Sequence, residues 1–258
     1  MDSVAKDDAD RYRAPALDKG LDILELLAAT EEGLSQAEIA KALDRTPNEI
    51  YRMLDRLTRR QYVMRTSADR YELTLKLFTL VHQHAPIRRL VPLAMPELRA
   101  FARRAQQACH LAIYDRGHVV VIAQVDSPGY WGFAIRVGSH VGLFNTGSGH
   151  VLLAFATPRE RALMMEEHAV MPHERVPADI EERLAIVRRQ GFEKMHSQQT
   201  AGVLNLSVPI FGPNGGVAAA LTCPYLERSD TTMAPDADEA LALLRISASR
   251  IMPAPAEG

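Results

Sequence analysis

The sequence predicts an α+β protein with two domains, a small helical one followed by a larger one built on a mainly antiparallel sheet. Residues 17–60 carry apolar side chains at helical spacing in three short segments, and a short alternating run follows them. From residue 109 onward, apolar runs of strand length surround turn residues such as those of DRGH. Prolines at positions 86, 92 and 96 interrupt the helical pattern between the two parts.

The first two helices are expected within residues 16–44. In ALDKGLDILELLAA, leucines recur every three or four residues on one helical face, and the glycine-containing TEEGL ends the pattern. SQAEIAKALD opens with Ser35 and has Glu38 three residues later, the spacing of a reciprocal capping box. A short second helix that buries Ile39 and Leu43 follows from this pattern.

A third helix and a hairpin complete the first domain. Thr46 can cap a helix that has Pro47 at its first position, where the missing amide hydrogen costs nothing. The helix is expected to run to about Arg60, and YVMRTSADRYELT then forms two strand-like runs around a turn. Two short helices joined by a tight turn, with a hairpin behind them, predict a winged helix-turn-helix.

The distribution of charge indicates what this domain contacts. The formal net charge is −2, yet residues 45–76 hold eight basic and four acidic side chains. A solvated helix face is the alternative, but the basic side chains lie opposite the apolar ones, on a helix of the size that enters the major groove. We expect Asn48, Glu49 and Arg52 to face bases, and Arg45, Arg59, Arg65 and Arg70 to hold the DNA backbone. Tyr51 and Arg56 fit either role, and packing against the first helix is an alternative for Tyr51.

The connecting region predicts a linker helix and the start of a second domain. TLKLFTLVHQH continues with helical spacing, and LVPLAMPELRAFARRAQQ is amphipathic behind a start marked by two prolines. We therefore expect a disordered acidic tail at 1–13, the DNA-binding domain at 14–75, the linker helix at 76–90 and a second domain at 91–258.

A ligand site is expected in LFNTGSGHVLLAFA. Asn145, Thr146 and Ser148 are good helix caps, and Gly147 and Gly149 permit close approach of the backbone. Free amides at a helix start favour an anion, so a carboxylate could bind there. An ordinary capped helix behind a glycine-rich loop is the alternative.

The motifs APALDKGLDILELLA, GLSQAEIAKAL, IYRMLDRL, RYELTLKL, IRVGSHVGLFNTGSGHVLLAF and GFEKMHSQQTAGVLNLSVPIFGPNGGVAAAL together resemble the IclR family of bacterial transcriptional regulators. The resemblance runs from about Ala14 to Leu244. It implies a GAF-like effector-binding domain and a homodimer, or dimer of dimers, on a pseudo-palindromic operator. The implied ligand is a small organic acid, such as an aromatic or sugar acid, and no cofactor is implied. Whether the chain represses or activates transcription stays open.

The resemblance also assigns site residues. The family's effector-contacting segment matches Asn145, Thr146, Gly147, Ser148, Gly149 and His150, and its pocket strands match Asn205, Ser207 and Thr222. Trp131 corresponds to a region near the pocket mouth or a subunit contact, with core packing as the alternative. Two departures leave the effector open: His150 stands where the family commonly has lysine, and Ser197 or Gln198 stands where it commonly has an acid.

Other functions find less support in the residues. The nine histidines include the pairs His82/His84 and His168/His173, but neither pair has the spacing of a strong zinc motif. Cys109 and His110 are neighbours in an expected strand and point to opposite faces. A metal-responsive regulator is the rival hypothesis and an enzyme a weaker one. The two cysteines read as buried thiols, and no membrane span or secretory signal is apparent, so we expect a cytoplasmic protein.

Overall fold

The computed structural model describes residues 14–130, 132–172, 174–227 and 234–252, and its chain divides into two compact units, Met1–His84 and Ala85–Gly258. The expected tail at 1–13 and Trp131 lie outside the described residues. The division falls within the range expected for the linker helix, between helices α5 (Lys76–Gln83) and α6 (Ala85–Ala105).

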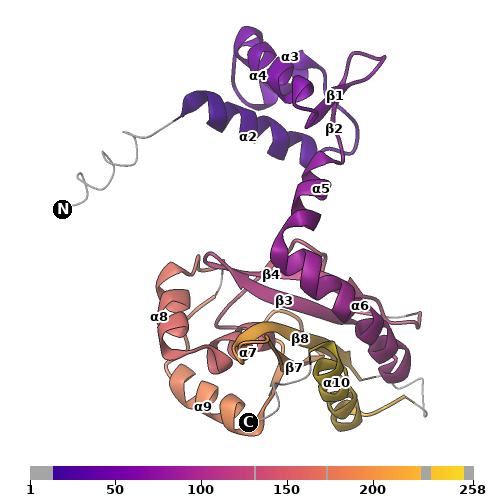
Figure 1. Cartoon of the computed structure of the whole chain (residues 1–258), viewed down its shortest axis with the longest axis vertical. Helices are drawn as coiled ribbons and strands as arrows, with labels where there is room; N and C mark the ends of the chain where they lie inside the picture. Colours follow the sequence, from indigo (N-terminus) through magenta and orange to yellow (C-terminus); the bar gives the residue numbers. More distant parts are fainter. Residues whose placement is uncertain (1–13, 131, 173, 228–233, 253–258) are drawn as a thin grey trace, which may run out of the picture. The chain divides into compact units, whose positions relative to one another are not determined.

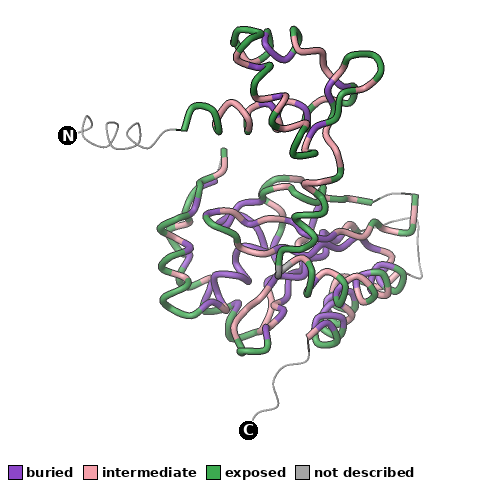
Figure 2. Tube along the Cα trace, turned by 45° about the horizontal axis from the view of Figure 1, so that its top comes forward, coloured by how far each residue is buried: buried purple, intermediate pink, exposed green. Residues whose placement is uncertain are grey.

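The first unit is a winged helix-turn-helix, as the sequence predicts (Figure 1). Its elements before α5 are α2 (Pro15–Ala28), α3 (Gln36–Ala42), α4 (Pro47–Arg59), β1 (Val63–Arg65) and β2 (Tyr71–Leu73). The two strands pair antiparallel and form the wing. The helices share a core centred on the fully buried Ile23, Ile39, Ile50 and Leu54 (Figure 2).

Local capping explains where α3 and α4 begin. The Ser35 amide donates to the Glu38 carboxylate over 2.8 Å, and the Glu38 amide donates back to the Ser35 hydroxyl, which confirms the predicted capping box. Thr46 and Glu49 form a second capping box at α4, where Pro47 takes the first helical position. These contacts satisfy amides that the first turn of a helix leaves free.

The second unit is built on one antiparallel sheet with the strand order β5-β4-β3-β8-β7-β6. Its strands are β3 (Cys109–Asp115), β4 (His118–Val125), β5 (His140–Val141), β6 (Glu193–His196), β7 (Val203–Phe211) and β8 (Val217–Leu226). Its helices after α6 are α7 (Gly147–Phe155), α8 (Pro158–Glu167), α9 (Ile180–Gln190) and α10 (Ala237–Ile251). The mixture of helices with an antiparallel sheet confirms the predicted fold class.

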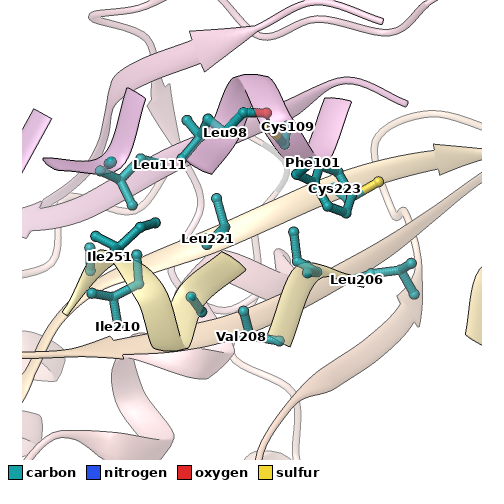
Figure 3. Close-up of a cluster of buried hydrophobic side chains, with 14 of the residues drawn as sticks. Leu98, Phe101, Cys109, Leu111, Leu206, Val208, Ile210, Leu221, Cys223 and Ile251 are labelled. Atoms are coloured by element: carbon teal, nitrogen blue, oxygen red, sulfur yellow. Dashed lines mark hydrogen bonds between the residues drawn. The ribbon is translucent and has the colours of Figure 1, made fainter. Parts of the chain in front are cut away.

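Two apolar clusters cover opposite faces of this sheet. Helices α6 and α10 pack on one face, where Leu98, Phe101 and Leu111 are fully buried with both cysteines (Figure 3). Burial raises the pKa of the Cys109 thiol to about 12, in keeping with the expected inert role. Helix α7, with α9 behind it, covers the other face. Side chains that alternate along β3 and β8 therefore point either to the first cluster or to α7.

Helix α6 differs from its sequence-based description. It begins at Ala85 and runs unbroken to Ala105, so Pro92 and Pro96 lie inside it rather than at a ragged start. Each interior proline removes one backbone hydrogen bond. Ala94 and Leu98, fully buried one helical turn apart, pack into the cluster against the sheet, and we attribute the unbroken helix to this packing.

Candidate nucleic-acid interface and ligand site

Helix α4 presents one polar face to solvent. Asn48, Tyr51, Arg52 and Arg56 are exposed and recur every three or four residues, while Ile50 and Leu54 face the core. The Tyr51 ring is 55% exposed, so it does not pack under the first helix. The spacing aligns these polar groups along one side of the helix, where a long molecule can contact them together.

The arginines of the unit divide into free and paired groups. Within the described residues, no ion pair involves Arg45, Arg52 or Arg56. Arg59 pairs with Asp55 at 3.0 Å, Arg65 pairs with Asp69, and Arg70 bonds to Glu38 and to the Gly33 carbonyl. These three guanidinium groups, and that of Arg60, which has no ion pair among the described residues either, are thus available to an external anion.

Glu49 is occupied within the protein. One carboxylate oxygen accepts from the Lys19 ammonium at 2.6 Å, and the other accepts from the Thr46 amide and hydroxyl. These bonds, the one from Lys19 first, lower the pKa of Glu49 to about 2. Its side chain connects α2 to the start of α4 and is less available to a base than Asn48 or Arg52.

In the second unit, the start of α7 is fully enclosed. Residues 141–154 are buried, including Asn145, Thr146, Ser148 and His150. The Thr146 hydroxyl accepts from the Gly149 amide at 3.1 Å and donates to the Gly142 carbonyl at 2.6 Å. A β-carbon at Gly149 would lie 2.1 Å from the Leu143 carbonyl oxygen, so this position requires glycine. We find no partner for the Gly147 and Ser148 amides in the described part of the chain.

A chain of buried polar groups crosses the sheet beneath this helix start. The Ser148 hydroxyl bonds to the Thr222 hydroxyl at 2.9 Å, and the Thr222 hydroxyl donates to the Ser207 hydroxyl at 2.8 Å. His110 Nε2 lies 3.4 Å from the Ser148 hydroxyl. Three side chains that the sequence selects therefore meet, and they are joined by His110, which it does not select.

Asn205 and Asn145 border the same place. Asn205 is half-buried on β7, and a β-carbon built at Gly147 would lie 3.4 Å from its β-carbon. The Asn145 side chain is 9% exposed, and its oxygen has no hydrogen-bond partner among the described residues. Nδ1 of His110 is buried without a partner as well, and burial lowers the pKa of His110 to about 4. The imidazole is therefore neutral near pH 7.

His150 does not have the surroundings expected for a lysine substitute at the ligand. It is fully buried, with Nδ1 at 2.6 Å from the Glu193 carboxylate and Nε2 at 2.9 Å from the Phe144 carbonyl. The acid that pairs with it comes from β6, while Gln198 is exposed and the Ser197 hydroxyl accepts two backbone amides. The sequence alone does not identify Glu193.

His168 and Glu174 form a second buried pair, which holds the N–H of Phe144, as His150 holds its carbonyl. His168 Nε2 lies 2.8 Å from the Glu174 carboxylate, which also accepts from the Phe144 amide at 2.6 Å and the Met171 amide at 2.9 Å. Burial opposes ionisation of Glu174, but these hydrogen bonds outweigh it and lower its pKa. Within the described residues, no cluster of three metal-ligating side chains occurs.

The two sites define a class of protein: a regulator with one unit for a nucleic acid and one for a small molecule. Comparison with known families agrees. The IclR helix-turn-helix domain matches residues 16–67, and the bacterial transcriptional regulator IclR C-terminal domain matches residues 81–252. The chain belongs to the IclR family of DNA-binding transcriptional regulators.

Individual relatives support this assignment. The chain is 29% identical over 241 residues to the transcriptional regulator BhcR of Paracoccus denitrificans, covering 89% of this chain and 85% of BhcR. It is 28% identical over 236 residues to KdgR of Escherichia coli, covering 89% and 88%. These relatives are regulators rather than enzymes.

Two solved structures share the fold. The IclR of Thermotoga maritima superposes with a TM-score of 0.73 at 24% identity, covering 91% of this chain and 96% of that one. An IclR homolog of Microbacterium hydrocarbonoxydans complexed with 4-hydroxybenzoate superposes with a TM-score of 0.74 at 20% identity, covering 92% and 97%. Among the described helices, we find none long and apolar enough to span a membrane.

Proposed function

We propose that this regulator binds a pseudo-palindromic operator as a dimer or dimer of dimers, and that a small organic acid at the start of α7 changes its affinity for DNA. One observation carries the proposal. Each unit holds polar groups that have no partner among the described residues: exposed cations on α4 in the first unit, and the Gly147 and Ser148 amides, which can donate to an anion, at the start of α7 in the second.

On DNA, Asn48 and Arg52 contact base edges in the major groove, and Tyr51 and Arg56 extend the same face. Arg45 contacts phosphate directly. Arg59, Arg65 and Arg70 reach phosphate only by exchanging their present partners, so each contributes less. We assign Glu49 to positioning α4 rather than to reading a base, because its carboxylate is already bonded on both oxygens.

A second copy of the chain covers the apolar side chains that the first unit leaves exposed. Leu75, the residue before α5, is 78% exposed, and Phe78 and Val81 within α5 are 58% and 49% exposed. Leu17 and Leu21 are exposed on α2. Their contact in a dimer removes apolar surface from water. A dimer also sets the spacing of two α4 helices on two half-sites.

The effector carboxylate accepts hydrogen bonds from the Gly147 and Ser148 amides at the start of α7. A relative that is complexed with 4-hydroxybenzoate makes aromatic acids the first class to test, and sugar acids the second. Binding there favours one arrangement of the dimer, and the angle or spacing of the two α4 helices changes with it. The rival hypothesis, a metal effector bound by histidines, predicts a response to zinc rather than to acids.

The test is fluorescence anisotropy of the purified protein on DNA from upstream of its own gene, at two salt concentrations and with random DNA as control. We expect tighter binding to the upstream DNA, and a shift of its affinity by at least one acid of a panel. Binding that is equal on both DNAs and vanishes with salt would refute the operator. Specific binding that responds to zinc alone would refute the acid effector.

A matched variant tests the position of the effector. Thr222→Val keeps the size of the side chain but breaks the hydroxyl chain between Ser148 and Ser207. We expect a weaker acid response with operator affinity unchanged in the absence of acid. An unaltered dose response in Thr222→Val would place the effector elsewhere.

A further inference from the structure

We propose that His110 takes up a proton when a carboxylate binds at the start of α7, so that the anion enters the buried site together with its own counter-charge. The inference rests on the effector site proposed above and adds a specificity-determining residue to it. Two observations support it. One is the direction of the hydrogen bonds that join Ser207, Thr222, Ser148 and His110. The other is that no other described side chain along these bonds can carry a positive charge.

The hydroxyl groups fix the direction of the chain. Thr222 donates its one hydroxyl hydrogen to Ser207, so the bond between Ser148 and Thr222 must be donated by Ser148. The hydrogen of Ser148 is then used, and the contact between Ser148 and His110 requires a hydrogen on His110 Nε2. A neutral imidazole with its hydrogen on Nε2 carries a lone pair on Nδ1.

Nδ1 of His110, with its lone pair, is the atom of this site that can accept a proton. Nδ1 of His110 is buried without a hydrogen-bond partner, and the whole residue is 2% exposed. Such a group usually has a partner, because a buried polar atom left unpaired costs free energy. A proton at Nδ1 gives the ring a positive charge while the bond from Nε2 to Ser148 is kept.

Among the residues that the structure describes, the groups around His110 carry no charge that would balance an anion. Strand β8 contributes Thr222, β7 contributes Ser207, α7 contributes Ser148, and β4 contributes Gln124, the residue paired with His110 across the strands. The acidic Asp126 bonds to the Gln124 amide and is exposed.

The other titratable groups nearby are already engaged or face away. His150 of α7 is bonded to Glu193 and to the Phe144 carbonyl, so it has no free ring nitrogen. Cys109 and Cys223, the neighbours of His110 and Thr222 along their strands, point into the cluster beneath α6 and α10. A carboxylate at the first turn of α7 thus meets amides and hydroxyls, and His110 is the group along the polar chain that can become a cation there.

Charge neutrality then controls the affinity. In the empty site burial keeps the ring neutral, with a pKa of about 4. A nearby carboxylate raises the pKa of an imidazole by about 1 to 3 units, and more where both are buried. We therefore expect a pKa of about 5 to 7 for His110 in the complex, and so uptake of about 0.1 to 0.9 proton per bound acid at about pH 6. The affinity should fall up to about tenfold per pH unit above the pKa of the complex.

The test is isothermal titration calorimetry of the full chain with benzoate, 4-hydroxybenzoate and pyruvate, at about pH 6 in buffers of different ionisation enthalpy. The slope of the observed heat against that enthalpy counts the protons taken up. We expect a slope between about 0.1 and 0.9 for the wild type, set by the pKa of His110 in the complex. His110→Gln keeps an N–H for Ser148 but cannot titrate, so it should bring the slope close to zero and remove the pH dependence. His118→Gln, on a ring stacked against His140, is the matched control and should behave as wild type.

The outcomes separate this inference from the effector site. Acid binding to the wild type with no proton uptake overturns the role of His110 and leaves the effector site standing, whether or not the variant folds. Proton uptake that survives in folded His110→Gln overturns it also. No binding of any of the three acids overturns this inference for aromatic and 2-oxo acids, whereas the proposed effector site is refuted only if the operator complex responds to no acid of the wider panel.

Discussion

The outer face of α4 exposes its polar groups to solvent, whereas the start of α7 buries them. On α4, unpaired side chains from one short helix face solvent, and the core beneath them is complete without them. At α7, side chains from β3, β7, β8 and the helix itself meet in a buried network. Replacing an exposed group on α4 should therefore change binding and leave folding intact, whereas replacing a buried group near α7 should change stability as well.

The largest effect is expected where the buried carboxylate of Glu174, which supports the segment before α7, is removed. Glu174→Ala leaves His168 without its carboxylate and the Phe144 and Met171 amides without an acceptor. Each hydrogen-bond donor left unpaired in the interior costs about 1 to 3 kcal/mol, so the loss over these groups should amount to several kcal/mol. Urea unfolding should show this loss, with Glu182→Ala, an exposed glutamate on α9, as control. A loss as small as that of the control would mean that the pair contributes little.

Low pH should weaken the interactions of the Glu174 carboxylate with His168 and the two backbone amides. Because folding lowers the pKa of Glu174 below its ordinary 4.5, its contribution is fully present above that value and is lost as the pH falls through the folded-state pKa. The wild type should thus lose more stability on acidification below about pH 4.5 than Glu174→Gln, which cannot titrate there. Parallel pH profiles of the two proteins by urea unfolding would contradict this account.

On the exposed side, Arg52→Ala should affect DNA binding alone. A bidentate contact of arginine with a base is worth about 1 to 3 kcal/mol, which is roughly a 5- to 150-fold loss of operator affinity. Thermal unfolding should be unchanged, because Arg52 has no ion pair within the described residues. Arg189→Ala, an exposed arginine on α9, serves as control. An equal loss on operator and random DNA would reassign Arg52 to the phosphate backbone.

The smallest effect is expected for a helix cap in the first unit, whose loss should lower both the stability of the protein and its affinity for the operator. Thr46→Ala removes the hydroxyl that accepts from the Glu49 amide and donates to its carboxylate. Loss of such a cap costs about 1 kcal/mol. We expect a similarly modest fall in operator affinity, because the start of α4 carries Asn48 and Arg52. Thr157→Ala, which breaks the same type of cap on α8, should reduce stability but leave DNA binding unchanged. Equal effects of both variants on binding would argue against a role for the α4 cap.

The same contrast explains what the sequence can predict. The winged helix-turn-helix depends on signals within a few residues of one another, such as the Ser35 and Thr46 caps and Pro47, and the structure confirms that fold. The polar network at α7 depends on strand register. His110 meets Ser148 only because β3 pairs with β8 so that His110 lies beside Thr222.

One missed residue carried a usable signal, and two others did not. The family resemblance selects Asn205, Ser207 and Thr222, which are polar side chains in apolar strands, and a search for that feature would also have found His110. The pairs of His150 with Glu193 and of His168 with Glu174 depend on where loops and β6 come to lie. No local pattern reveals those partners.

The backbone of Phe144 is held at both of its polar groups, by Glu174 at its N–H and by His150 at its carbonyl. These supporting groups and the hydroxyl chain with His110 have no side chain in common. Substitutions can therefore accumulate in one set while the other persists. In evolutionary terms, such a scaffold can change the groups that a ligand would meet without first losing the helix that presents them.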